Sequence, residues 1–406
     1  MVWLPGGGFV QGAGSDYDAT RLATQGHVIV VTVNYRLGAL GFLDLPALRA
    51  QSADSGNYGL ADQQAALRWV RGSIAAFGGN PRQVTLAGQS GGAYSVCAHL
   101  AAPGSRGLFA RAIVQSGPCG NAFVTGSEAQ NRGLAAAAAL GCSQPATLLA
   151  CLRGKPAAAL VPLGAGKVFT ATGRISDLPW MPVAGSPALP VQPLMALRAG
   201  TAARVPLIQG STADELRPFV ALQFSPPDQK ITAQTYAATL TGIFGGRAAA
   251  VLSRYPASRY PTPAIALATV LTDWGRKLGS CPVLPADDAA ARHGAVYAYE
   301  WAQDSGQSLA GFPLGAPHSG ELPYLFDGSY TQQPPPSAPA QLQLSRQLIS
   351  YWTQFARTGN PNRPGLPPWP RYRASGPVLS LAAGPEGIAT ANFAAAHQCS
   401  FWNHGT

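Results

Sequence analysis

The segment from Val84 to Gly92 holds a serine in a setting that could make it a nucleophile. It reads Val-Thr-Leu-Ala-Gly-Gln-Ser-Gly-Gly, so Ser90 stands in the pattern Gly-x-Ser-x-Gly. The apolar residues before the serine predict a strand and those after it a helix. On such a tight turn the hydroxyl projects above the sheet, and the two glycines let the backbone pass closely. This arrangement favours acyl transfer through a serine ester; the alternative is a glycine-rich turn with an incidental serine.

Acyl transfer also needs N–H donors for the negative charge that develops on the carbonyl oxygen. The amide of Gly91, directly after the serine, is one candidate. Further donors are expected from a glycine-rich loop after an earlier strand. Gly7 and Gly8 follow a short apolar strand predicted at residues 1–4 and meet this requirement, although a flexible turn would have the same composition.

A general base for Ser90 must come from a histidine. Histidines occur at 27, before the serine, at 99, 293 and 318, and at 397 and 404 near the C-terminus. Proteins with this turn carry the acid and then the histidine after the serine. His99 lies about 13 Å further along the helix that follows Ser90, and His293 precedes the strand predicted at 296–301. His318 follows that strand in a loop, at the edge of the sheet where active-site residues gather.

The carboxylate that orients the histidine must come from a short list, since the chain has only 18 acidic residues. Asp214 and Glu215 both leave the strand predicted at 205–209 at the end where the site is expected. A buried carboxylate there would hold the imidazole in the required tautomer and stabilise its protonated form. Spacing does not choose between the two. Glu300 and Glu321 are interpreted as carboxylates without a catalytic part.

The composition argues against other classes of function. The 406 residues include 28 basic and 18 acidic side chains, a net charge of +10, yet only 11% of residues are charged. The basic residues are scattered singly, without the cationic stripe that is typical of nucleic-acid binding, and so indicate a solvated surface. No apolar run approaches the 18 residues that suggest a membrane span.

The order of predicted elements indicates an α/β fold with a mostly parallel sheet. Short apolar runs predict strands at 28–33, 84–87, 112–115, 205–209 and 296–301. The first of these is rich in valine and is expected to be buried on both faces. Apolar residues that recur every three or four positions predict a helix over 60–77. Residues 216–290 are interpreted as a helical, irregular insertion over the sheet.

The beginning of the chain is unusual for a domain of this kind. Met1-Val2-Trp3-Leu4 reads as a strand with no element before it to pair or cap it. The basic start and longer apolar stretch of a signal peptide are not present in this sequence. We therefore expect that an N-terminal portion is missing before residue 1.

Taken together, these motifs resemble the type-B carboxylesterase family of the α/β-hydrolase fold, which includes cholinesterases and bacterial and fungal esterases. The resemblance runs along essentially the whole chain and implies one catalytic domain over residues 1–406. Besides the serine segment, it is carried by residues 30–38, 56–63, 77–81, 112–117, 213–215, 318–324 and 355–361. The second of these reads Gly-Asn-Tyr-Gly-Leu-Ala-Asp-Gln.

The resemblance assigns roles that spacing leaves open. It implies Ser90 as the nucleophile, His318 as the base and Glu215, rather than Asp214, as the acid. The remaining implied residues are Gly7, Gly8 and Gly91 as donors to the oxyanion and Ser116 as a support behind the histidine and the glutamate. This machinery needs no metal or cofactor, and the expected partner is a small-molecule ester.

Three features depart from the family pattern. Pro5 stands where the family has histidine or an aromatic residue, so one amide before the glycine loop is lost. Gln89 stands where the family has glutamate, so a negative charge close to His318 is missing. Family members also carry a segment of strands and a disulfide loop before the glycine loop, which this sequence lacks. The choline-binding tryptophan of cholinesterases lies in that segment, so nothing in this sequence supports a choline substrate.

Six cysteines occur, at positions 97, 119, 142, 151, 281 and 399. Similar esterases imply the pairs Cys142–Cys151 and Cys281–Cys399, and disulfides imply an oxidising compartment outside the cytoplasm. Cys97 is expected to pack within the helix after Ser90, and Cys119 to be free or to have lost its partner. A zinc site is not expected, because no C-x-x-C motif or cysteine–histidine pair has the spacing of zinc ligands.

The sequence therefore predicts a secreted serine carboxylic-ester hydrolase that acts on small or medium esters through a Ser–His–Glu triad and an acyl-enzyme. Amide or carbamate cleavage would use the same machinery. The alternative is a non-catalytic, cholinesterase-like binding module or an inactive truncated fragment. Non-catalytic relatives usually lack the serine, which this chain keeps.

Overall fold

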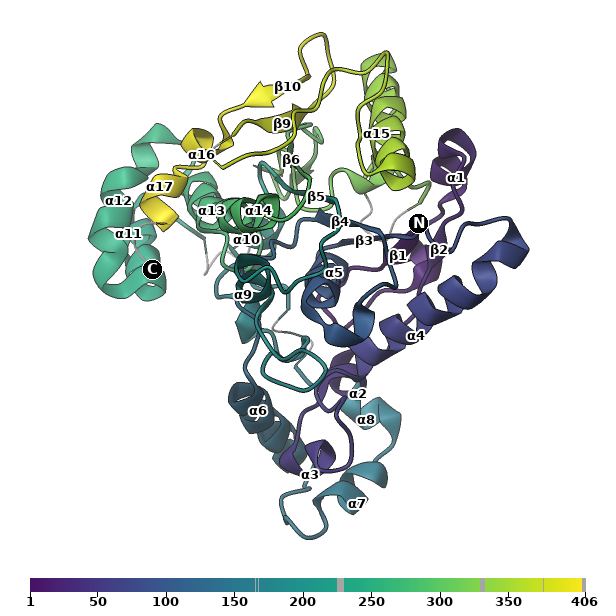
Figure 1. Cartoon of the computed structure of the whole chain (residues 1–406). Helices are drawn as coiled ribbons and strands as arrows, with labels where there is room; N and C mark the ends of the chain where they lie inside the picture. The colour runs from purple at the N-terminus through teal and green to yellow at the C-terminus, as the bar shows by residue number, and fades with distance from the viewer. Residues whose placement is uncertain (165, 167, 225–229, 329–332, 375, 404–406) are drawn as a thin grey trace.

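A computed structural model describes residues 1–164, 166, 168–224, 230–328, 333–374 and 376–403. Its centre is an eight-stranded sheet in the order β10-β9-β6-β5-β4-β3-β1-β2 (Figure 1). The strands are β1 (Val2–Leu4), β2 (Val31–Thr32), β3 (Thr85–Gln89), β4 (Arg111–Gln115), β5 (Leu207–Thr212), β6 (Val296–Trp301), β9 (Val378–Leu381) and β10 (Ile388–Ala391). All neighbours run parallel except β9 and β10. The predicted α/β fold with a mostly parallel sheet is thus confirmed.

The structure corrects the strand predicted at residues 28–33. The expectation of a strand over 28–33 that is buried on both faces is wrong. Only Val31 and Thr32 form β2, which pairs with β1 at the edge of the sheet, and residues 28–32 are partly exposed. Within the described residues, β2 has a paired neighbour on one side only, so Val31 lies at the edge of the sheet rather than in its centre.

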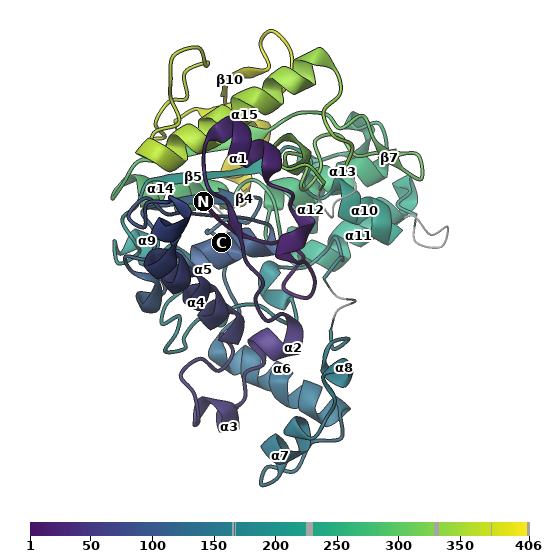
Figure 2. The same ribbon diagram turned by 90° about the vertical axis from the view of Figure 1, so that its right-hand side faces the viewer.

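Helices cover both faces of the sheet (Figure 2). They are α1 (Thr20–Gly26), α2 (Gly38–Phe42), α3 (Pro46–Arg49), α4 (Tyr58–Ser73), α5 (Gly91–Ala101), α6 (Gly126–Ala139), α7 (Leu148–Arg153), α8 (Ala157–Leu160), α9 (Pro193–Arg198), α10 (Arg217–Phe224), α11 (Ala233–Phe244), α12 (Ala248–Arg254), α13 (Pro263–Trp274), α14 (Val283–Ala291), α15 (Pro339–Thr358), α16 (Phe393–Ala396) and α17 (Cys399–Asn403). Side chains alternate between two cores along each strand. Leu86 of β3 packs in the core with α5, and the next residue, Ala87, in the core with α15.

The predicted helix over 60–77 is present with a change of type near its end. It begins as α4 at Tyr58 and continues from Ile74 to Phe77 as a 3₁₀ helix. Gly78 then adopts a left-handed conformation with φ 78°, which ends the helix. Helices α10 to α14, with their connecting turns, occupy the described part of 216–290; residues 225–229 of that predicted insertion lie outside the described residues. No described helix combines the length and the apolar character needed to cross a lipid bilayer.

Three disulfides tie the elements together. Two join the implied pairs, Cys142–Cys151 and Cys281–Cys399. Cys97 is buried in α5, as expected, but the expectation that Cys119 is free or has lost its partner is wrong, because Cys119, in the segment after β4, is bonded to Cys97. Since β3 and β4 are neighbours in the sheet, the helix that follows β3 lies over the segment that follows β4. This brings the two Cα atoms to 5.3 Å, within disulfide range.

The loops that these disulfides close differ in length, which gives a prediction for stability. Cys281 and Cys399 are 118 residues apart, and Cys142 and Cys151 are 9 apart. A longer closed loop removes more conformational entropy from the unfolded chain. Replacing both cysteines of the long loop by alanine should lower the free energy of unfolding by about 4–5 kcal/mol, and those of the short loop by about 2.5–3 kcal/mol. Urea denaturation of both double variants measures this; equal losses would contradict the ordering.

Candidate active site

Ser90 occupies the turn between β3 and α5. Its backbone has φ 57° and ψ −122°, an uncommon conformation for a residue with a side chain. The Ser90 N–H donates to the carbonyl of Gln115 in β4 at 2.9 Å, which holds the turn against the neighbouring strand. The flanking glycines are sterically required. A Cβ on Gly88 would lie 2.6 Å from backbone atoms of Gly92, and a Cβ on Gly92 would lie 2.0 Å from the carbonyl oxygen of Leu4.

Ser90 opens on a cavity of about 110 Å³. Most of its wall is apolar, and the apolar side chains are Val168, Phe169, Ile175, Leu178, Phe219 and Leu278. The polar and small residues on it are Gly7, Gly8, Gly91, Tyr94, Lys277, His318 and Ser319. The cavity therefore collects the predicted serine, histidine and glycines from three distant parts of the chain.

The predicted oxyanion donors lie beside one another in this cavity. Gly7 and Gly8 have φ values of 105° and 60°, which a glycine adopts without strain. A Cβ on Gly91 would lie 3.3 Å from the amide nitrogens of both Gly8 and Phe9. The glycine loop after β1 is thus packed against the start of α5, where several backbone N–H groups can face one oxygen.

Glu215 and His318 are joined by a hydrogen bond. The Nδ1–H of His318 donates to the Glu215 carboxylate at 2.5 Å, and the other carboxylate oxygen accepts from the N–H of Thr212 at 2.9 Å. Glu215 is fully buried. Thr212 ends β5, and the loop with His318 follows the neighbouring strand β6, so the parallel sheet brings both side chains to one edge. With its proton on Nδ1, the imidazole keeps a lone pair on Nε2.

The neighbouring carboxylate, Asp214, makes different contacts. It forms a salt bridge with Arg217 at 2.8 Å and accepts from the N–H of Ala316 at 3.0 Å. Burial raises the pKa of Asp214, and the charge of Arg217 opposes that rise. Asp214 therefore fastens the loop that carries His318, whereas Glu215 contacts the imidazole itself.

Ser90, the predicted nucleophile, lines the same cavity as His318 but is not hydrogen-bonded to it. Within the described residues, no hydrogen bond joins the serine hydroxyl to the imidazole; instead the Nε2 atom of His318 accepts from the side-chain amide of Gln89 at 3.1 Å. The same amide nitrogen donates to the hydroxyl of Ser319 at 2.9 Å. Hydrogen bonds of catalytic groups are often long without substrate and tighten when it binds.

Comparisons with known proteins agree with this geometry. A model of the carboxylesterase family matches residues 1–402. The chain belongs to the carboxylesterase family. It is 34% identical to an acetylcholinesterase of Bungarus fasciatus over 434 aligned positions, which cover 100% of this chain and 68% of that protein. It is 35% identical to a para-nitrobenzyl esterase of Bacillus subtilis strain 168 over 380 positions, 92% of this chain and 73% of that protein.

The resemblance drawn from the motifs is thus confirmed, and so is the fold that it implied. As a carboxylesterase of type B, the protein is a carboxylic ester hydrolase. Among the described residues, no group of three or more histidine, cysteine, aspartate or glutamate side chains is placed to hold a metal ion.

Two further buried residues bear on the sequence predictions: Glu321, interpreted there as non-catalytic, and Ser116, expected to support the histidine and the glutamate. Glu321 is fully buried, and one carboxyl oxygen accepts from Gln115 at 3.0 Å. Burial raises its pKa to about 7, and the negative charge of Glu215 adds to the rise. The position of Glu321, three residues after His318, was the sequence signal that could have placed this carboxyl group near the histidine. Ser116 is also buried, but its hydroxyl has no partner among the described residues, so its supporting role stays a prediction.

Of the described histidines, only His318 lines the cavity that Ser90 opens on. His99 is buried between Ser105 and Gln63, at 2.8 and 2.9 Å. His293 lies beside Gly200 and Val205, before β5 and β6 begin. His404 lies outside the described residues.

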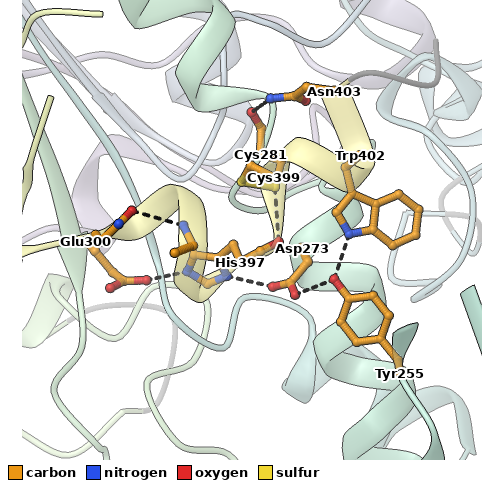
Figure 3. The surroundings of a disulfide bond; sticks show 10 residues. Tyr255, Asp273, Cys281, Glu300, His397, Cys399, Trp402 and Asn403 are labelled. Carbon is orange, nitrogen blue, oxygen red and sulfur yellow. Dashed lines mark hydrogen bonds and ion pairs between the residues drawn. A yellow bond between two sulfur atoms is a disulfide. The ribbon is translucent and has the colours of Figure 1, made fainter. Parts of the chain in front are cut away.

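His397 is held between two carboxylates, beside the Cys281–Cys399 disulfide (Figure 3). Its Nδ1 lies 2.6 Å from Asp273 and its Nε2 2.5 Å from Glu300. Burial alone would lower the pKa of His397, but its hydrogen bonds to both carboxylates outweigh burial and raise the pKa to about 10. Both ring nitrogens are occupied, so His397 serves the structure rather than the cavity.

The raised pKa makes stability depend on pH in a defined direction. An imidazole with a pKa above its unfolded value of about 6.5 contributes stability that is complete below that value and is lost as pH rises through the folded pKa, about 10. Replacing Glu300 by glutamine removes one of the two charges. The loss therefore begins near pH 6.5 in both proteins, and in the E300Q variant it should be smaller and should end at a lower alkaline pH than in wild type.

Urea denaturation between pH 6 and pH 10.5 measures this. Replacement of the exposed Glu386 by glutamine provides the matched control and should follow wild type at every pH. Parallel curves for wild type and E300Q would show that His397 does not hold its proton in this range.

Proposed function

We propose that this protein hydrolyses carboxylic esters through an acyl-enzyme on Ser90, with His318 as general base and Glu215 as the carboxylate that orients it. The observation that carries the proposal is the bond between buried Glu215 and His318 Nδ1, because it leaves Nε2 as the acceptor on a cavity that Ser90 also lines. Such a pair supplies the tautomer and the charge stabilisation that a serine nucleophile needs.

The reaction proceeds in two stages. The Ser90 oxygen attacks the ester carbonyl while its proton passes to Nε2 of His318, and the carbonyl oxygen gains the negative charge. The amides of Gly7, Gly8 and Gly91 donate to that oxygen. The C–O bond to the alcohol then breaks, and His318 returns the proton to the departing alkoxide. Water, deprotonated by the same imidazole, attacks the acyl-enzyme and restores Ser90.

In the first stage, the hydrogen bond between the Gln89 amide and His318 has to break. In the resting site the Gln89 amide occupies the Nε2 lone pair of His318. For proton transfer, that hydrogen bond must be exchanged for one from the Ser90 hydroxyl. Gln89 keeps a second acceptor in Ser319, so the amide remains partly bonded when the imidazole turns to the serine.

The cavity walls support a range of substrates, and the disulfides support a location of the protein outside the cytoplasm. A cavity of about 110 Å³ with mostly apolar walls suits esters with small or medium acyl groups. Three disulfides, together with the similarity to a snake acetylcholinesterase, support a protein that works outside the cytoplasm. Phe219, whose ring centroid lies 5.6 Å from that of His318, supports a role for 216–290 as an insertion that covers the site.

Replacing Ser90 by alanine tests the nucleophile. The S90A variant should lose hydrolysis of p-nitrophenyl acetate and butyrate by about 10⁴-fold or more, because no other group can form the acyl-enzyme. A fluorophosphonate probe should label wild type at Ser90 and leave S90A unlabelled, as read by mass spectrometry. Folded wild-type protein that neither turns over nor takes up the probe would favour a binding module instead.

The two adjacent carboxylates provide a matched test of the acid. Both can be replaced by their amides, which keep the shape and remove the charge. E215Q should reduce kcat by about 10³–10⁴-fold, since the amide favours the wrong imidazole tautomer. D214N should change kcat by less than about tenfold while lowering the melting temperature, because it loses the salt bridge to Arg217. The reverse ranking of kcat would transfer the role to Asp214.

A further inference from the structure

Lys277 is a cation on the wall of the same cavity as Ser90. It lies in the turn between α13 and α14, and only 5% of its surface is exposed. Lysine is rarely buried to this extent unless a carboxylate pairs with it. Within the described residues, no carboxylate lies within salt-bridge distance of its ammonium group.

Among the residues that the structure describes, the hydrogen-bond partners of the ammonium group are all neutral. It donates to the carbonyl oxygen of Thr170 at 2.7 Å and to the hydroxyl of the same residue at 3.0 Å. An ammonium carries three N–H donors, so one remains for another acceptor. Burial lowers the pKa of Lys277 to about 8, and the charge of Asp177 opposes the fall. The group therefore stays mostly charged at neutral pH.

The backbone around Lys277 is fixed. Its carbonyl accepts from the hydroxyl of Tyr94 at 2.7 Å, and Tyr94 in turn accepts from Asn121 at 2.8 Å. The carbonyl of the preceding residue, Arg276, accepts from the N–H of Ile175 at 2.9 Å. These bonds join the turn to α5 and to the neighbouring segment that contains Thr170 and Ile175, so the lysine is positioned rather than loose.

The rest of the cavity makes an unpaired charge costly. Its other side chains are mostly aliphatic or aromatic. A charge in such surroundings is poorly solvated and interacts strongly with any counter-ion that enters. The missing counter-charge would be supplied by a ligand that also reaches Ser90.

We infer that Lys277 forms an anion-binding subsite in the catalytic cavity, which gives the enzyme a preference for esters that carry a separate ionised carboxylate, such as monoesters of dicarboxylic acids. This inference rests on the proposed function, because the ester group must reach Ser90 while the carboxylate meets the ammonium. In this arrangement the third N–H of Lys277 donates to the substrate carboxylate, and its charge is neutralised only when substrate is bound.

Two pairs of esters test the inference, each differing only by a carboxylate in place of a methyl group. Monoethyl adipate is compared with ethyl hexanoate, and the acetate ester of 4-hydroxybutanoate with butyl acetate. The readout is the ratio of kcat/KM for the charged ester to that for its neutral partner, which does not depend on the amount of active enzyme. Replacing Lys277 by methionine should lower this ratio about 10- to 100-fold in at least one pair. Replacing it by arginine should retain most of the preference.

The exposed Lys230 provides the matched control. K230M removes the same charge from the surface and should leave both ratios as in wild type, which separates a local contact from the field of the whole basic protein. Ratios that stay unchanged in K277M would overturn the inference and reduce Lys277 to a link between its turn and Thr170.

Binding without turnover separates this inference from the proposed function. Calorimetric titration of S90A with monoethyl adipate and ethyl hexanoate should show tighter binding of the charged ester, and S90A/K277M should lose the difference. Equal binding of both esters to S90A would overturn the subsite even if wild type hydrolyses neutral esters. A wild type that hydrolyses neither ester, but whose S90A variant still discriminates between them, would instead overturn the proposed reaction and leave the subsite standing.

Discussion

The turn that carries Ser90 depends on backbone segments that pass closer together than a side chain would allow. The carbonyl of Leu4, at the end of β1, lies where a Cβ on Gly92 would stand. Because β1 pairs with β3, this close passage also brings the glycine loop after β1 against the start of α5. One steric constraint thus places the serine turn and the glycine loop against each other. The unusual backbone of Ser90 is held in place by its bond to β4 and by the helix that follows.

The two histidines with carboxylate partners, His318 and His397, differ in how many carboxylates each contacts, and this number decides which ring nitrogen can change its partner. His397 contacts two carboxylates, one at each ring nitrogen, and is held in its charged form. His318 contacts one carboxylate, Glu215, and its other nitrogen meets the neutral amide of Gln89. That nitrogen can therefore exchange a partner. The remaining nearby carboxylates do not compete for it, since Asp214 is paired with Arg217 and burial favours the protonated form of Glu321.

The cavity is built from segments that meet only in the folded chain. Residues 168–178 and the turn at 275–278 contribute adjoining parts of its wall. The two segments are joined by hydrogen bonds from Lys277 to Thr170 and from Ile175 to Arg276. The Cys97–Cys119 disulfide fastens α5, which begins at the serine, to the segment after Ser116. Rigid supports of this kind keep reacting groups within the small tolerances that catalysis needs.

The sequence by itself determined the features that depend on local sterics and periodicity. Glycines at 88 and 92 indicated the turn, and apolar runs separated by helical periods indicated the parallel sheet, because backbone clearance and side-chain period are properties of neighbouring residues. The choice of Glu215 over Asp214 as the partner of His318 came from the family resemblance, since spacing alone does not say which of two adjacent carboxylates turns inward. Only the tertiary structure decided the Cys97–Cys119 bond, the edge position of β2, the contact of Gln89 with His318 and the burial of Lys277. These depend on which distant segments become neighbours, and burial and electrostatic pairing are properties of those neighbours rather than of the chain order.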